Sequence, residues 1–262
     1  MAEETTYTAV TGMVTISTAN ARLDGGGTLG TVITGATTGT IIKSVSIKAQ
    51  ANTTEGMIRL FIFSGANNFL LAEIPVPSVT KSSRDKSFET HFELDLFLQE
   101  GDVLKASTEK GEPFNIIAIA LNVSYGTYPR MDTTIFTAQN GYDTVSVANS
   151  NLDGTGTLVQ ILQSFSGSFL GAQIQRIFLK AISTTSSGML RLFIRNSAGT
   201  STLLFTEIPV SAVTPTATAI SFEEVLVYNN FFLQAGYKIM ASTENAQTFV
   251  VSVEAMNFTS AT

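Results

Sequence analysis

The sequence predicts an all-β protein that consists of two tandem, homologous jelly-roll β-sandwich domains. Three observations predict this class. The chain repeats itself over its whole length, each copy holds about eight short runs of β-branched and aromatic residues, and no stretch of ten or more residues shows helical periodicity. Eight short antiparallel strands in a copy of roughly 130 residues fit a jelly-roll sandwich.

The repeat is clearest in the stretch FLQEGDVLKASTE at 97–109, which returns as FLQAGYKIMASTE at 232–244. NARLDGGGTL, which starts at Asn20, likewise returns as NSNLDGTGTL from Asn149. Each copy is longer than the units of about 20–50 residues that build solenoids, so each should fold around its own core. The expected first domain, linker and second domain are residues 1–125, 126–133 and 134–262.

The first four strand-like runs of the first copy lie between turn residues. Threonine and valine dominate the first run, which ends before Asn20, and the second run ends at Gly35. The third run begins after Gly39, and the fourth lies between Gly56 and Gly65. The strands expected here are 7–17, 29–34, 40–49 and 57–63.

The last four runs follow the same rule. The fifth ends at Pro75, which cannot donate to a sheet ladder, and the eighth begins after Pro113. Gly101 separates the sixth run from the seventh, and it can adopt a positive φ without steric cost, as Gly236 can in the second copy. The strands expected here are 69–74, 87–98, 102–108 and 114–124, and the second copy repeats the series.

The last strand of the first copy is apolar on both faces. Where the two copies agree, as at Ile116 and Val251, the face should be core, because strand residues alternate between faces. The other face carries Ser252 and Glu254 in the second copy but large aliphatic residues in the first. These residues are Ile117, Ile119 and Leu121. We expect the second copy or another subunit to cover them, since an exposed patch of this kind binds or aggregates.

A second candidate interface lies on the outer face of the fourth strand. Met, Phe and Arg recur there in both copies, and these residue types are enriched at protein interfaces. The set consists of Met57, Arg59, Phe61 and Phe63 with Met189, Arg191 and Phe193. A loop folded over the sheet would produce the same composition. If the set is an interface, Phe61→Asp or Phe193→Asp should disrupt assembly while each sandwich stays folded.

The sequence predicts no catalytic, cofactor or metal site. His91 lies among carboxylates on the polar side of its strand, but copy two carries Leu226 at the position we align with it. The LDGGGT and LDGTGT segments at Asp24 and Asp153 lack the further ligands of a calcium loop, so they read as turns. Glu73 and Glu207 share the EIPV motif and could form an acid–base pair, but such a pair needs both carboxylates in one cleft, which the sequence does not indicate. We expect a protein that is not an enzyme.

Composition limits the partners. The net charge is −6 with no basic run, which disfavours nucleic acid as a partner. No apolar run approaches the ~18 residues of a membrane span, and the acidic segment MAEETTYTAVTG lacks the basic and apolar regions of a signal peptide. We therefore expect no membrane association and synthesis in a cytoplasm. There is no Cys, which excludes disulfides and thiolate chemistry.

With its two eight-strand copies, its FLQEGD and FLQAGY hairpins and its sparse charge, the chain resembles tandem jelly-roll structural proteins of virus particles, most closely phage capsid or head- and tail-associated auxiliary proteins. The resemblance covers the whole chain. It implies a virion structural protein whose partners are further copies of itself, as a trimer or larger ring, and other virion proteins. The alternative from another class is a glycan-binding jelly-roll module of an adhesin or receptor-binding protein.

Overall fold

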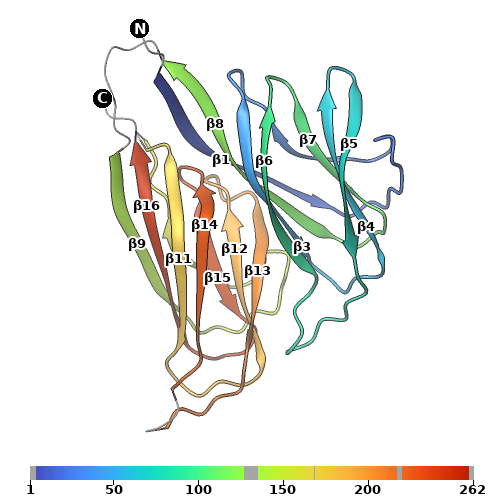
Figure 1. The fold of residues 1–262 in the computed structure, drawn as a ribbon. Helices are drawn as coiled ribbons and strands as arrows, with labels where there is room; N and C mark the ends of the chain where they lie inside the picture. The colour runs from blue at the N-terminus through green and yellow to red at the C-terminus, as the bar shows by residue number, and fades with distance from the viewer. Residues whose placement is uncertain (1–3, 127–134, 168, 217–219, 260–262) are drawn as a thin grey trace.

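The computed structural model describes residues 4–126, 135–167, 169–216 and 220–259, and these residues form sixteen strands and no helix (Figure 1). The all-β class is therefore confirmed. No helix in these ranges is long and apolar enough to cross a membrane. The first eight strands are β1 (Glu4–Ile16), β2 (Gly30–Thr34), β3 (Thr40–Ala49), β4 (Gly56–Ser64), β5 (Asn67–Val76), β6 (Glu89–Leu98), β7 (Val103–Thr108) and β8 (Phe114–Gly126).

These eight strands build one β-sandwich from two four-stranded antiparallel sheets. One sheet has the order β1-β8-β3-β6 and the other the order β2-β7-β4-β5. Strands that follow one another in sequence mostly belong to opposite sheets, which is the jelly-roll arrangement. All eight expected strands are present, and each begins and ends within three residues of its expected position.

The second sandwich repeats this plan strand for strand. Its sheets have the orders β14-β11-β16-β9 and β10-β15-β12-β13. The predicted linker 126–133 lies outside the described residues except for Gly126. The strands are β9 (Ile135–Val145), β10 (Val159–Gln163), β11 (Gly171–Ala181), β12 (Gly188–Arg195), β13 (Thr202–Val210), β14 (Glu223–Leu233), β15 (Lys238–Thr243) and β16 (Phe249–Thr259).

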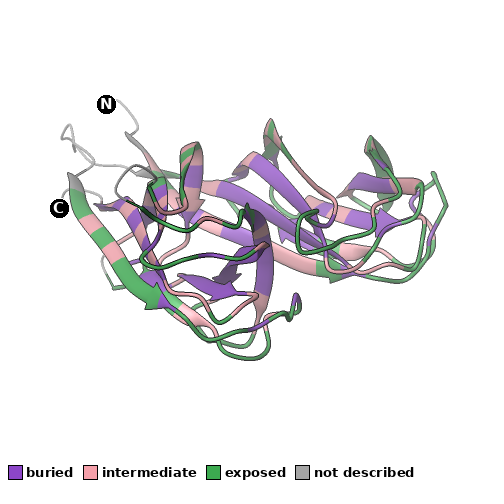
Figure 2. Cartoon of the chain, turned by 90° about the horizontal axis from the view of Figure 1, so that it is seen from below, coloured by how far each residue is buried: buried purple, intermediate pink, exposed green. Residues whose placement is uncertain are grey.

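Each sandwich has its own core between its two sheets, and Figure 2 shows that buried residues concentrate on the strands while the loops are exposed. Ile116 and Val251, the inner-face residues on which the copies agree, are both buried, as expected. Gly101 and Gly236 both adopt a φ of 79° at the predicted turn, a conformation that residues with a Cβ rarely adopt.

The residues from the candidate interface on the fourth strands are mostly covered by the chain itself. Phe61 and Phe193 are fully buried, and so are Met189 and Arg191 within the second domain. Phe193 packs against Leu152, which belongs to the loop that begins at Asn149. Phe193 thus has the loop cover that the alternative explanation expects, whereas Met57 and Phe63 are half-buried and an interface through them stays a prediction. Phe61→Asp or Phe193→Asp would place a charge in a core and unfold its domain.

Candidate functional site

The main site that the fold creates is the contact between the two domains. The outer face of the β1-β8-β3-β6 sheet meets the β13 and β14 edges of the second sandwich, and Figure 1 shows β5 on the far side of the first domain. Ile117 and Ile119 on β8 are each 1% exposed and belong to the hydrophobic core of the second domain. Leu121 is half-buried. The second copy is thus the element that covers this apolar strand.

A buried lysine forms the polar centre of the contact. Lys48 on β3 is 1% exposed, and its Nζ lies 3.0 Å from Glu89 Oε2 and 3.0 Å from Glu207 Oε2. It also donates a hydrogen bond of 3.1 Å to the carbonyl oxygen of Ser87. We call Lys48, Ser87 and Glu89 the Lys48 cluster. A buried ammonium is tolerated only when carboxylates and acceptors surround it in this way.

The second domain inserts Glu207 into the Lys48 cluster. Its Oε2 accepts hydrogen bonds from the Ser87 N–H at 3.0 Å and the Ser87 hydroxyl at 2.8 Å. Its Oε1 lies 2.9 Å from Arg191 Nε, which holds the side chain on its own sheet. Burial alone would raise the pKa of Glu207, but the charge of Lys48 and the hydrogen bonds from Lys48 and Ser87 outweigh it and lower the pKa to about 2.

We expect this contact to weaken in acid. The pKa of Glu207 in the folded chain lies below its ordinary value of 4.5, so its contribution to stability is complete above that value and is lost as the pH falls toward 2. The loss should reach about 3 kcal/mol, measured by urea unfolding at pH values between these limits. A Glu207→Gln variant should lack this pH-dependent part of the free energy of unfolding. If the variant lost as much stability in acid as the parent, Glu207 would not be its source.

Backbone and amide hydrogen bonds add to the contact. Ala9 N–H donates to the carbonyl oxygen of Leu170 at 2.9 Å, and Asn115 Nδ2 donates to that of Leu204 at 3.2 Å. Gly171 lies so close to Ala9 that a Cβ on it would stand 2.4 Å from the Ala9 Cβ, and its φ is +146°. A residue other than glycine at 171 would therefore push the two domains apart.

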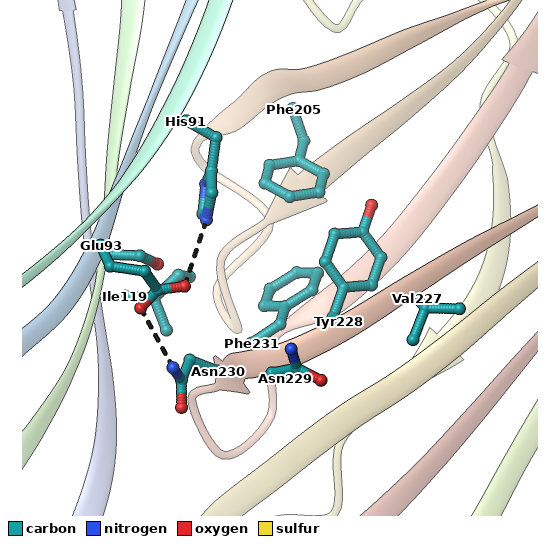
Figure 3. A pocket seen from close by; sticks show the side chains of 10 residues that line it. His91, Glu93, Ile119, Phe205, Val227, Tyr228, Asn229, Asn230 and Phe231 are labelled. Atoms are coloured by element: carbon teal, nitrogen blue, oxygen red, sulfur yellow. Dashed lines mark hydrogen bonds and ion pairs between the residues drawn. The ribbon is translucent and has the colours of Figure 1, made fainter.

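A pocket of about 310 Å³ opens beside this contact and is lined by both domains. Figure 3 shows His91 and Glu93 from β6 facing Phe205, Tyr228 and Phe231 from the second domain. Asn230 Nδ2 donates to Glu93 Oε2 at 3.0 Å, and His91 Nε2 lies 3.8 Å from Glu93 Oε1. Burial, together with the charge of Glu89, raises the pKa of Tyr228, which stays neutral. Aromatic faces beside amide and carboxylate groups suit a polar, hydroxyl-rich ligand.

The other candidate residues serve local structure. Asp24 pairs with Arg22 and accepts the Gly26 N–H at 3.0 Å, while Asp153 accepts both the N–H and the hydroxyl of Thr155. These are turn interactions, as expected. In the part of the chain that the structure describes, no group of three or more His, Cys, Asp or Glu side chains could hold a metal ion.

The sequence pointed to Glu207 but not to its partner Lys48. A lysine inside a strand reads as a solvent-facing residue, and only the burial of the whole face by the second domain changes that reading. The strand register also corrects one alignment. Phe178 on β11 pairs with Val225 as Ser46 on β3 pairs with His91, so the counterpart of His91 is Val225 and not Leu226.

Comparison with known proteins adds no family. No protein-family model and no curated protein matches the chain. Among solved structures, the major capsid protein STIV MCP is 12% identical with a TM-score of 0.27, over 97% of this chain and 96% of that one. The CBM22-1–CBM22-2 tandem domain of Paenibacillus barcinonensis Xyn10C is 11% identical with a TM-score of 0.26, over 95% of this chain and 92% of that one. The Macrobrachium rosenbergii nodavirus structure is 9% identical with a TM-score of 0.23, over 99% and 90%. Scores this low carry no argument about function.

Proposed function

We propose that the chain is a non-enzymatic structural protein of a virus particle that acts by self-assembly and protein–protein contacts. The observation that carries this proposal is the β5 edge of the first domain. Phe69, Leu70 and Leu71 are exposed there, whereas their counterparts on β13 are buried, Phe205 among them against the first domain. We call Phe69, Leu70, Leu71 and Glu73 the β5 edge.

A surface of this kind favours association. β5 is the outermost strand of its sheet, so one side of its backbone is free of ladder hydrogen bonds to another strand of the described sheet. β5 carries a charge at Glu73, a proline at Pro75 and a bulge at Leu71, which protect such an edge from pairing with a further strand, so a contact here would be made by side chains. Three consecutive large apolar side chains that remain exposed are typical of a surface that meets another protein.

The virion part of the proposal rests on organisation. Two jelly rolls joined by a buried contact make a stiff block, and the sparse charge of its surface suits close packing against other copies. The chain would act as a capsid, capsid-decorating or tail-associated component, in a phage particle. Its location would be the virion, with further copies and other virion proteins as partners.

The test is the mass of the full-length protein in solution, measured by light scattering behind a sizing column across a concentration series. We expect a discrete oligomer whose population grows with concentration over a series that extends to about 1 mM, where a contact worth only ~4 kcal/mol is half occupied. A chain that stays monomeric over this whole range would overturn the proposal.

The second candidate function is glycan binding, favoured by the pocket between the domains, where Phe205 and Tyr228 lie beside Asn230. In that case the monomer should bind a sugar on a glycan array. The Asn230→Ala variant should not bind that sugar. Binding that this variant leaves unchanged would exclude the pocket as the sugar site.

A further inference from the structure

The second domain carries a copy of the Lys48 cluster. Lys180 on β11 pairs with Glu223 on β14, as Lys48 on β3 pairs with Glu89 on β6. The following alanines also correspond, because Ala181 pairs with Phe249 as Ala49 pairs with Phe114. The strand register thus assigns Lys180 to the position of Lys48 without reliance on sequence similarity.

The contacts of the two lysines correspond as well. Lys180 Nζ lies 2.5 Å from Glu223 Oε2 and donates to the carbonyl oxygen of Ser221 at 3.4 Å. Lys48 makes the same two contacts with Glu89 and Ser87, and its third partner is Glu207 from the other domain. We call Lys180, Ser221 and Glu223 the Lys180 cluster. It has no third partner in the part of the chain that the structure describes.

The first domain carries a copy of the Glu207 side chain. Glu73 pairs with Arg59 at 2.9 Å between neighbouring strands, as Glu207 pairs with Arg191 at 2.9 Å. Among the described residues, Arg59 is its only ion-pair partner. The side chains of Lys48 and Glu207 are each 1% exposed, whereas those of Lys180 and Glu73 are 42% and 41% exposed.

Apolar residues lie around both exposed charged residues, Glu73 and Lys180. Leu71 is the counterpart of Phe205, since each is the bulge residue that its strand pairing skips. Around the Lys180 cluster, Val225 and Val227 on β14 are exposed, and Ile220 is exposed where the first domain has Lys86. The β5 edge therefore offers apolar side chains and one carboxylate to a surface where Val225 and Val227 lie beside the ammonium of Lys180. Arg176 and Glu254 lie on the same face and pair with each other.

We propose that the β5 edge of one copy docks on the outer face of the β14-β11-β16-β9 sheet of a second copy, with Glu73 entering the Lys180 cluster. This inference rests on the proposed self-assembly and names the surfaces that carry it. The contact repeats between molecules the arrangement that Glu207 and the Lys48 cluster form within one. It joins unlike surfaces, so successive copies follow one another head to tail and give a closed ring if the rotation closes or a filament if it does not.

The test compares variants of the full-length chain by light scattering over the same concentration series. Glu73→Gln should raise the dissociation constant of the assembly at least about tenfold, because the covered Lys180 would keep Glu223 but lose the second carboxylate. Glu100→Gln, on the exposed turn after β6, is the matched control and should leave it unchanged. Since Arg59 keeps Glu109 at 3.5 Å, Glu73→Gln should fold normally.

A mutual-rescue pair makes the test specific for these two surfaces. Leu71→Lys and Val225→Glu both change exposed residues. Their counterparts in the contact between the two domains are Phe205 and His91, which line one pocket and therefore lie close together. Each variant alone should assemble at least about tenfold more weakly, and an equal mixture should recover assembly through the new opposite charges.

The outcomes separate the inference from the proposed function. Weakened assembly of the three variants with recovery in the mixture supports the docking described above. A parent that assembles while Glu73→Gln, Leu71→Lys and Val225→Glu assemble equally well overturns the docking and leaves self-assembly through another surface. A parent that stays monomeric overturns both.

Discussion

Replacing Lys48 with methionine should lower the free energy of unfolding by about 3–5 kcal/mol, although the substitution keeps most of the volume of the side chain. The cost arises because the buried Glu207 and the half-buried Glu89 would lose the ammonium that lies 3.0 Å from both, and Arg191 alone would remain beside Glu207 within the contact. Urea unfolding, monitored by far-ultraviolet circular dichroism, measures the change in the free energy of unfolding.

Lys180→Met is the matched control for this measurement. Lys180 occupies the same position in the second sandwich, but its pair with Glu223 is exposed, so its loss should cost at most about 1 kcal/mol. Equal effects of the two substitutions in dilute protein would contradict the role of Lys48 as the centre of the domain contact.

Ile119→Ala should lower the free energy of unfolding by about 2–5 kcal/mol, and the loss should appear in the domain that does not contain the residue. Ile119 belongs to β8 of the first domain, yet it packs within the core of the second. Hydrogen exchange measured by mass spectrometry should therefore accelerate in β13 and β14 more than in β2 and β7.

Val225→Ala provides the comparison for Ile119→Ala. Val225 is also an outward-facing residue of a jelly-roll sheet, but it is exposed, so its truncation should change stability by no more than about 0.5 kcal/mol. Faster exchange confined to the first domain in Ile119→Ala would show that the second core does not depend on this side chain.

The contrast between these residues shows how far the sequence reaches. Alternation and turn residues predicted all the strands of the first copy, because each strand records its own faces and ends locally. The same alternation showed that Ile117 and Ile119 needed a cover. It did not reveal that Phe193 needed none from outside, since whether a loop or another molecule covers an apolar face depends on contacts distant in sequence.

The polar centre was beyond the sequence for a related reason. Lys48 and Lys180 stand at matching positions of the repeat, and nothing in their neighbouring letters distinguishes a buried lysine from an exposed one. The difference comes from Glu207, 159 residues after Lys48, and from the placement of one sandwich on the other. Comparison of the two copies in three dimensions was needed to see that one cluster is paired and the other is not.

The insertion of Ile117 and Ile119 into the second core gives the chain an order of maturation on the ribosome. The first sandwich leaves the exit tunnel with these side chains facing water, and the strands that bury them are made later. At about 5–20 residues per second, the second half of the chain takes on the order of ten seconds to emerge. During that interval the nascent first domain exposes an apolar face that favours aggregation. General chaperones should therefore bind the incomplete chain and release it once β13 and β14 have formed.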